Sequence, residues 1–333
     1  MVYTKEHIKQ LLMNNAIFMV LGILIIGIIF IRPDFMQMKV VWNVLSQAST
    51  KLILALGVCF TLLIAGTDLS AGRMVGLSAV ISASMLQTMS YSGRFFPDMG
   101  LPPLIWPILL AILACMAFGL LNGFLVAKFD MHPFIATLAV QVMVYGVVSL
   151  YFDMPPNNSQ PLGGFREDFL AIGQKIPGTD ISRLIPIAML VTLIVWFILN
   201  KTNFGKNIYA IGGNREAAVV SGVNVFRTIL VIFVLAGALY GIAGVLEAAR
   251  TAGATNNYGL GYELDAIAAC VVGGVSLNGG VGTVAGIISG VLIFQVIQVG
   301  LQFIGISPMW QQIIKGVIIA VAVAIDMAKY KRK

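Results

Sequence analysis

Long runs of apolar residues recur along almost the whole chain, and they constrain the fold more than any other feature. The clearest cover residues 44–65, 104–127 and 226–246. Each is close to the length of about 20 residues that an α-helix needs to cross a bilayer. Only 11% of the 333 residues are charged, whereas soluble domains carry roughly 25%. So few charges cannot cover a water-facing surface, and the sequence therefore predicts an all-α, polytopic membrane protein.

About ten transmembrane helices are expected in a single transmembrane domain that covers residues 1–333. The first, Ala16–Ile31, follows basic residues as a signal peptide would, but no small-residue cleavage site comes after it, so we expect it to be retained. Two others, residues 74–89 and 264–275, are short and lie beside glycine-rich sequence. The remaining expected spans are residues 44–65, 104–127, 134–151, 184–199, 226–246, 283–303 and 310–328.

The basic residues predict the orientation. They cluster before the first span (Lys5 and Lys9), between the sixth and seventh spans, and in the tail at residues 329–333. Lys and Arg are enriched in cytoplasmic loops, and an even number of spans returns the chain to its starting side. Both termini are therefore expected inside. Orientation also explains the formal net charge of +7 without a nucleic-acid partner, since the basic residues are not interleaved with aromatic ones.

The sequence offers no candidate catalytic residue, metal ligand or cofactor site. Cys59, Cys115 and Cys270 each lie in an apolar run and are expected to be small buried hydrophobic residues. His7 and His132 stand alone, so the clustered ligands of a zinc site are missing. No phosphate-binding G-x-x-x-x-G-K-[ST] loop occurs, which predicts that the chain itself binds no ATP.

The loop at residues 200–225, expected inside, contains a helix signal. Asn214 suits a helix N-cap, Glu216 suits the first turn, and Gly222 can take a left-handed end conformation. These residues predict a helix over 215–221 of about two turns, roughly 10 Å long. So short a helix is unstable alone in water. It is either a capped connector or a docking element for a cytoplasmic partner.

This loop also carries a resemblance to a known family. Its pattern T-x-F-G-x-x-x-x-A-I-G-G-N-x-E-A-A-x-x-S-G-x-N-V begins at Thr202 and ends at Val225. Residues 66–73 read G-T-D-L-S-A-G-R, and residues 254–274 contain A-T-N-N-Y-G followed by Y-E-L-D-A-I-A-A-C-V-V-G-G. With these motifs nearly the whole chain resembles the ribose- and galactoside-type permeases of ABC sugar importers.

The resemblance implies both a fold and a set of partners. The fold would be that of an ABC importer permease, working as a homodimer in the lipid of a bacterial inner membrane. Its partners would be a cytoplasmic ATPase, which holds ATP and Mg, and an external sugar-binding protein. The sugar would be galactose or methyl galactoside. Another sugar such as ribose, or an ion-coupled secondary sugar carrier, remains an alternative. The residues that would couple to the ATPase are Asn214, Arg215, Glu216, Ala217, Ala218, Ser221 and Gly222.

Two glycine-rich breaks place polar residues beside apolar runs. At the first, Asp68 and Ser70 either line the pathway or cap the next helix, with Arg73 as a counter-charge for Asp68. At the second, Ser276 and Asn278 occupy corresponding positions, so the two breaks form a faint internal repeat. Interrupted helices of this kind occur in transporter pathways, although the glycines could equally serve close helix packing.

Further polar residues lie around the last three spans. Asn256, Asn257, Glu263 and Asp265 are expected at the outer entrance of the eighth span, where they could contact the soluble receptor. The alternative is a solvated loop in which Asp265 caps a helix. Lys315 is expected to reach outward to the membrane surface, without a functional role.

Overall fold

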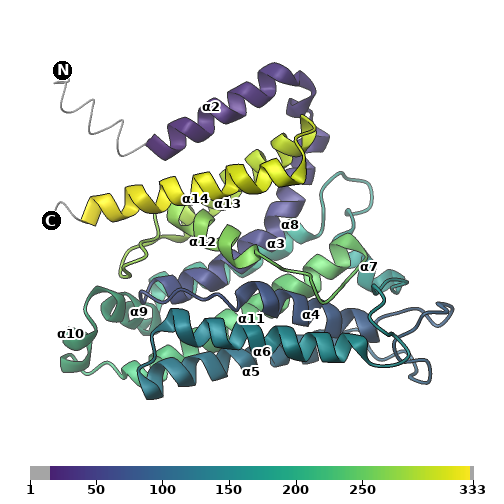
Figure 1. Ribbon diagram of the computed structural model, residues 1–333, viewed down its shortest axis with the longest axis horizontal. Coiled ribbons are helices and arrows are strands. Elements are labelled where there is room, and N and C mark those ends of the chain that lie inside the picture. The colour runs from purple at the N-terminus through teal and green to yellow at the C-terminus, as the bar shows by residue number, and fades with distance from the viewer. Residues whose placement is uncertain (1–15, 331–333) are drawn as a thin grey trace.

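The computed structural model describes residues 16–330 and shows a bundle of helices joined by loops (Figure 1). Within this range strand-like pairing is limited to isolated bridges, such as the one between Leu162 and Ala254. The all-α prediction is therefore confirmed. Lys5, Lys9 and the tail residues 331–333, which entered the predicted orientation, lie outside the described residues.

The long helices coincide with predicted spans. Among the described residues, six are long and apolar enough to cross a membrane: α3 (Met38–Leu62), α5 (Ile105–Phe129), α6 (Pro133–Asp153), α8 (Leu184–Lys201), α11 (Val225–Thr251) and α13 (Val284–Phe303). The apolar segments at either end of the chain form α2 (Ala16–Ile31) and α14 (Pro308–Tyr330). These helices confirm a polytopic membrane protein, and the number ten stays a prediction.

Two shorter helices lie where the sequence marked its weakest spans, α4 (Ala71–Met85) and α12 (Tyr262–Val272). At 1.5 Å per residue they are roughly 22 Å and 16 Å long, less than the hydrocarbon thickness of about 30 Å. Irregular backbone lies beside both short helices. The connections contain four further short helices: η1 (Pro33–Met36), α7 (Glu167–Gly173), α9 (Asn203–Gly213) and α10 (Arg215–Val220).

The core forms around α3, whose residues 53–62 are all buried. Next to it, α11 packs closely on α5 through glycines. A Cβ atom at Gly237 would lie 2.5 Å from the carbonyl oxygen of Cys115, and one at Gly119 would lie 2.3 Å from that of Phe233. Only residues without a side chain allow such an approach, which is common between membrane helices. The three cysteines are buried and unpaired, as predicted.

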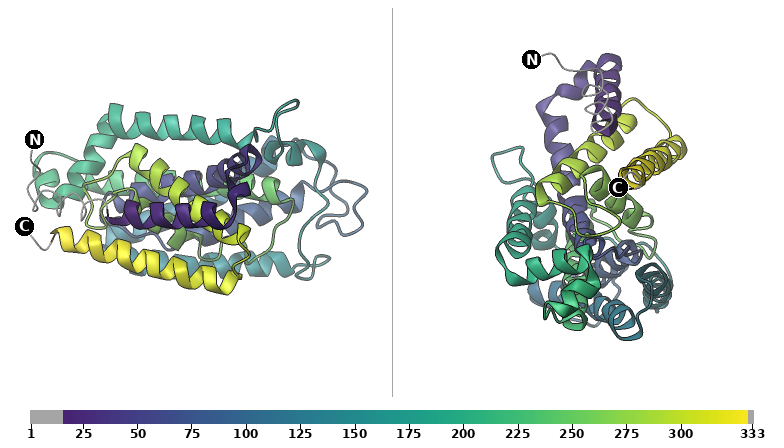
Figure 2. Two further views of the ribbon diagram at one scale, coloured as in Figure 1. Left: turned by 90° about the horizontal axis from the view of Figure 1, so that it is seen from above. Right: turned by 90° about the vertical axis from the view of Figure 1, so that its left-hand side faces the viewer.

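The helices give the molecule two distinct ends. The start of α2, the end of α14 and the short helices α9 and α10 lie at one end, whereas α7 lies at the other (Figures 1 and 2). The start of α2 and the end of α14 therefore lie at the same end as the loop at residues 200–225, and the orientation of the chain in the membrane stays a prediction. From the sides of the bundle, α5 and α8 expose apolar residues such as Trp106, Leu113 and Leu193, which suit contact with lipid.

Candidate functional site

The short helix predicted in the inner loop is present as α10. The Asn214 side-chain oxygen accepts a hydrogen bond from the backbone N–H of Ala217 at 2.9 Å, which makes Asn214 the N-cap. Gly222 has a φ of 82°, so the helix ends in the left-handed conformation expected of it. The sequence did not predict α9. The N-cap of α9 is Thr202, whose hydroxyl accepts from the N–H of Gly205 at 3.2 Å. This capping residue was the sequence signal that could have predicted α9.

Most of α10 is exposed. Ala218 is buried against Val225 and Ile229, which holds the helix to the body of the protein. Val219 and Val220 are 56% and 89% exposed. The other residues assigned to ATPase coupling are exposed as well: Asn214, Arg215, Glu216, Ala217, Ser221 and Gly222. Because α10 is anchored to the body of the protein and exposes two valines, it offers a surface for a partner protein.

Helix α9 connects this surface to both glycine-rich breaks. A Cβ atom at Gly212 would lie 1.8 Å from the carbonyl oxygen of Leu63 and 2.5 Å from the backbone nitrogen of Gly280. The Tyr209 hydroxyl donates to the carbonyl of Gly282 at 2.9 Å, and Gly280 N–H donates to Leu63 at 2.8 Å. The two breaks that looked like a faint repeat therefore meet beneath α9. A displacement of α9 would reach both.

At the first break, a buried hydrogen-bond network surrounds Asp68. One carboxylate oxygen accepts from the backbone N–H and the hydroxyl of Ser70, at 2.9 Å and 2.6 Å. The other accepts from the Tyr240 hydroxyl at 3.2 Å, while the Asn122 amide donates to the Ser70 hydroxyl at 2.8 Å. Asp68 thus binds the N–H of Ser70, the N-cap residue of α4, rather than N–H groups inside the helix.

The prediction that Arg73 is the counter-charge of Asp68 is wrong. The Arg73 guanidinium lies over the ring of Tyr145, 4.2 Å from its centroid, and donates to the carbonyl of Asn256 at 3.4 Å. Hydroxyl and amide donors satisfy Asp68 instead. At the second break, Ser276 is buried and its hydroxyl accepts from the N–H of Asn278 at 3.1 Å. The Asn278 side chain is exposed. Asp68, Ser70 and Ser276 are thus buried within the protein, and their place on a transport pathway stays a prediction.

The prediction that Glu263 and Asp265 contact a soluble receptor is also wrong. Both lie on α12 inside the bundle and are only 5% and 7% exposed. They are buried because the chain between α11 and α12 turns back along α4, where a Cβ atom at Gly76 would lie 2.4 Å from the carbonyl of Tyr258. Asn256 is half-buried and its amide donates to the Ser149 hydroxyl at 3.2 Å. Asn257 is exposed, and its contact with a receptor stays a prediction.

A group of charged residues crosses the bundle between α3, α11, α12 and α14. Lys315 forms an ion pair with Asp265 at 2.8 Å, so the prediction that it reaches outward is wrong. Lys51 lies over the ring of Tyr262. Glu247 accepts from Arg250 at 2.8 Å and from the Thr50 hydroxyl at 2.7 Å. Four of these charges form ion pairs within the protein and Lys51 stacks on an aromatic ring, so each has a partner, as charges at membrane depth usually do. The contacts join helices that are distant in sequence.

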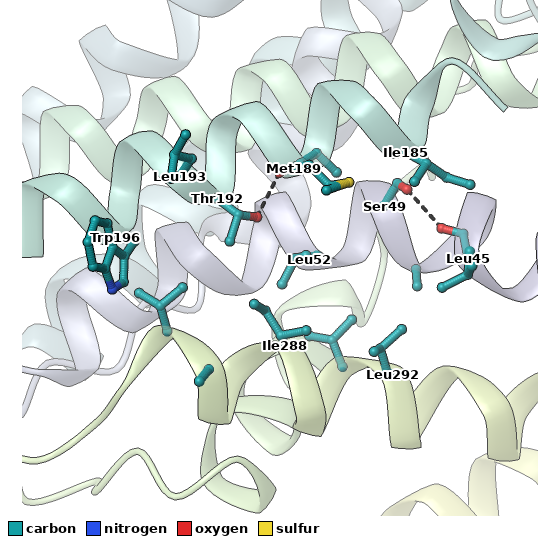
Figure 3. Close-up of a pocket in the computed structure, with 15 residues that line it drawn as sticks. Leu45, Ser49, Leu52, Ile185, Met189, Thr192, Leu193, Trp196, Ile288 and Leu292 are labelled. Atoms are coloured by element: carbon teal, nitrogen blue, oxygen red, sulfur yellow. Dashed lines mark hydrogen bonds between the residues drawn. The ribbon is translucent and has the colours of Figure 1, made fainter. Parts of the chain in front are cut away.

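A groove of about 570 Å³ lies between α3, α8 and α13 and is shown in Figure 3. Its two hydroxyl groups are already satisfied inside their own helices. Ser49 donates to the carbonyl of Leu45 at 2.8 Å and Thr192 to that of Ala188 at 2.7 Å. The rest of the lining is apolar, including Leu52, Met189 and Trp196. The groove therefore offers mainly hydrocarbon contact and few hydrogen-bonding groups for a sugar.

A second groove, of about 360 Å³, separates α13 from α14 and is more polar. Gln298, Gln302 and Gln312 line it together with Lys315. Gln311 also lines it, but its amide donates to the carbonyl of Ile306 at 2.7 Å. Because side-chain amides can form hydrogen bonds with hydroxyl groups, these glutamines give the second groove possible partners for a hydroxylated solute.

Together these features define a polytopic helical membrane protein. Its exposed helix α10 is connected through α9 to the two glycine-rich breaks, which is the architecture of a transporter subunit. A family profile described as "branched-chain amino acid transport system / permease component" matches residues 40–323. The chain belongs to this family of permeases and is a multi-pass protein of the bacterial inner membrane.

Named relatives match over nearly the full length. The galactose/methyl galactoside import permease protein MglC of Haemophilus influenzae is 51% identical, over 99% of this chain and 98% of the relative. The protein of the same name from Escherichia coli is 47% identical, over the same shares. The ribose import permease protein RbsC of Bacillus subtilis is 35% identical, over 97% of this chain and 95% of the relative. No solved structure matches the chain.

Proposed function

We propose that this chain is the permease subunit of an ABC importer for galactose or methyl galactoside. The support is the ordering of the relatives, since the galactoside permeases reach 51% and 47% identity and the ribose permease 35%. The chain catalyses no covalent change. ATP and Mg bind to a separate cytoplasmic ATPase, and an external binding protein delivers the sugar.

The observation that carries the mechanism is the path from α10 to the two breaks. The ATPase docks on α10, where Glu216, Val219 and Val220 are exposed. Its closure on ATP moves α10 and, through α9, the backbone at Leu63 and Gly280. ATP can shift the permease between its two states only through contacts that differ between them. The loop at residues 200–225 is the place for these contacts.

We further propose ten spans with both termini inside, in one domain that pairs with a second copy. The short helices α4 and α12 count as spans once the irregular segments beside them are included. Two copies related by a two-fold axis would enclose the pathway. The shared end of α2, α14 and α10 (Figure 1) supports this topology, since the ATPase side must then also hold both termini.

Uptake by a reconstituted importer tests the function. The chain, its ATPase and its binding protein are placed in liposomes, and uptake of labelled galactose is measured with ATP on the ATPase side. We expect ATP-dependent uptake that unlabelled methyl galactoside suppresses and ribose does not. Uptake of ribose instead, or galactose uptake that needs an ion gradient and no ATP, would overturn the proposal.

A further inference from the structure

The start of α4, the middle of α6 and the chain before α12 form one face. Two charged groups there, Arg73 and Glu263, have hydrogen-bonding capacity that no contact in the described residues fills. Tyr145 lies twelve residues after Pro133 and eight before Asp153, the ends of α6. At 1.5 Å per residue it is about 18 Å and 12 Å from those ends. Tyr145 is 39% exposed, and the guanidinium of Arg73 stacks on it at 4.2 Å. A cation therefore lies near mid-depth on a partly open face.

Such a cation cannot face lipid, because a charged side chain deep in the bilayer turns to protein or to water. The apolar faces of α5 and α8 suit lipid, and the face of Arg73 does not. It must border an aqueous space or a second copy of the chain. In the importer proposed above, the transport pathway would supply such an aqueous space.

Arg73 retains most of its donor capacity. A guanidinium has five N–H donors in one plane, and among residues 16–330 the structure gives it one hydrogen bond, to the Asn256 carbonyl at 3.4 Å. Stacking on an aromatic ring stabilises the charge through the face of the guanidinium and leaves its edges free to donate. A ligand with acceptor oxygens fits this arrangement.

An unused acceptor lies beside it. Glu263 is 5% exposed, and within the described part of the chain its Oε2 atom has no hydrogen-bond partner. The carboxylate reaches the backbone next to Arg73, since a Cβ atom at Gly72 would lie 2.0 Å from Oε2. A buried polar atom without a partner is costly. Oε2 is enclosed by protein in this state, so a hydroxyl group that donates to it and removes that cost requires α4 and α12 to separate first.

We propose that Arg73, Tyr145 and Glu263 contact the sugar as it crosses the permease. Sugar hydroxyls accept from the Arg73 edge and donate to Glu263, and the exposed part of the Tyr145 ring meets the C–H face of the pyranose. A neutral, polyhydroxylated solute uses all three groups, whereas an ion or an apolar solute does not. This inference rests on the proposed function and assigns a contact site to it.

Cysteine accessibility tests the position. In the assembled importer, Tyr145→Cys is treated with a water-soluble, membrane-impermeant thiol reagent, and Leu113→Cys on the lipid face of α5, where Leu113 is 57% exposed, is the matched control. The native cysteines are buried, which keeps the background low. We expect position 145 to react and position 113 not to react, and galactose-loaded binding protein to protect position 145 more than empty binding protein does. Absence of reaction at 145, or equal protection by empty and loaded receptor, would overturn the inference.

Transport stoichiometry tests the contact. Arg73→Met is expected to lower the galactose imported per ATP hydrolysed by about tenfold or more, because the lost charged hydrogen bonds correspond to roughly that factor. Arg73→Lys keeps the charge without the flat donor edge and should be intermediate. A damaged fold would lower uptake and hydrolysis together. An unchanged ratio in Arg73→Met would overturn the contact while wild-type uptake still supports the function, and failure of wild-type uptake would instead reject the function.

Discussion

Two polar clusters lie at the start of α4 and differ in how completely their carboxylates are satisfied. Just before α4, both carboxylate oxygens of Asp68 accept hydrogen bonds from Ser70 or Tyr240, and only Oδ1 of the neighbouring Asn122 has no partner among the described residues. In the first turn of α4, Arg73 makes one long hydrogen bond, and the carboxylate oxygen Oε2 of Glu263 beside it has no partner among the described residues. Both carboxylates are buried, so burial alone does not distinguish them. The difference indicates that the Asp68 cluster stabilises the fold and the Arg73 cluster remains available to a ligand.

The largest effect is expected for Asp68→Leu. It leaves three donors buried without an acceptor, namely the N–H and hydroxyl of Ser70 and the hydroxyl of Tyr240. At about 1–3 kcal/mol for each, the free energy of unfolding should fall by about 3 kcal/mol or more. The yield of folded protein and its melting temperature in detergent measure this. A melting temperature equal to that of the wild type would show that the cluster is not structural.

The next effect concerns the link between α9 and the turn beside Asp68. Gly212→Ala places a Cβ atom 1.8 Å from the Leu63 carbonyl, whereas Gly213→Ala meets nothing within 4 Å. Overpacking of this kind costs about 1–3 kcal/mol. We expect Gly212→Ala to lower ATP-driven galactose uptake by about tenfold or more and Gly213→Ala to leave it near the wild-type rate. Equal uptake by the two variants would remove α9 from the coupling path.

A smaller effect is expected for Tyr240→Phe. It removes one donor to Asp68 and leaves the two from Ser70 in place. The free energy of unfolding should fall by about 1 kcal/mol, which the shift of the melting temperature measures. A loss as large as that of Asp68→Leu would mean that the Tyr240 hydroxyl alone supports the cluster and that the two donors of Ser70 add little.

The smallest effect on stability is expected for Glu263→Gln. This exchange removes a buried charge that has an unpartnered oxygen, so the melting temperature should stay unchanged or rise. The matched exchange at the other cluster, Asp68→Asn, should lower it, because the added amide N–H₂ cannot accept from Tyr240. If Glu263→Gln lowered the melting temperature as much as Asp68→Asn, the two clusters would be alike and the comparison would fail.

The sequence predicted the features that depend on local pattern. Apolar runs located the long helices, and the capping signals of Asn214 and Gly222 located α10 to within one residue. The two short helices were recognised because glycine interrupts their apolar runs. These predictions succeeded because hydrophobic length and capping depend on residues that are close together in the chain.

The candidate site was harder to predict because it depends on tertiary contacts. Arg73 follows Asp68 by five residues, which suggested an ion pair, yet the side chain turns to Tyr145 on α6. Asp265 looked like a rim residue because only the structure shows that the chain before α12 turns back into the bundle. Its partner Lys315 interrupts the apolar sequence of α14. A lone charge within a span was the available signal, and it points to a partner on another helix.

The central claim is that an ATPase docks on α10, and its most direct test is co-purification of that ATPase with a charge-reversal variant. Glu216→Lys changes an exposed residue of α10, and Lys175→Glu changes an exposed residue at the opposite end of the molecule. With both variants folded in the membrane, we predict that Glu216→Lys loses the ATPase and Lys175→Glu retains it. Full retention of the ATPase by Glu216→Lys would contradict the claim.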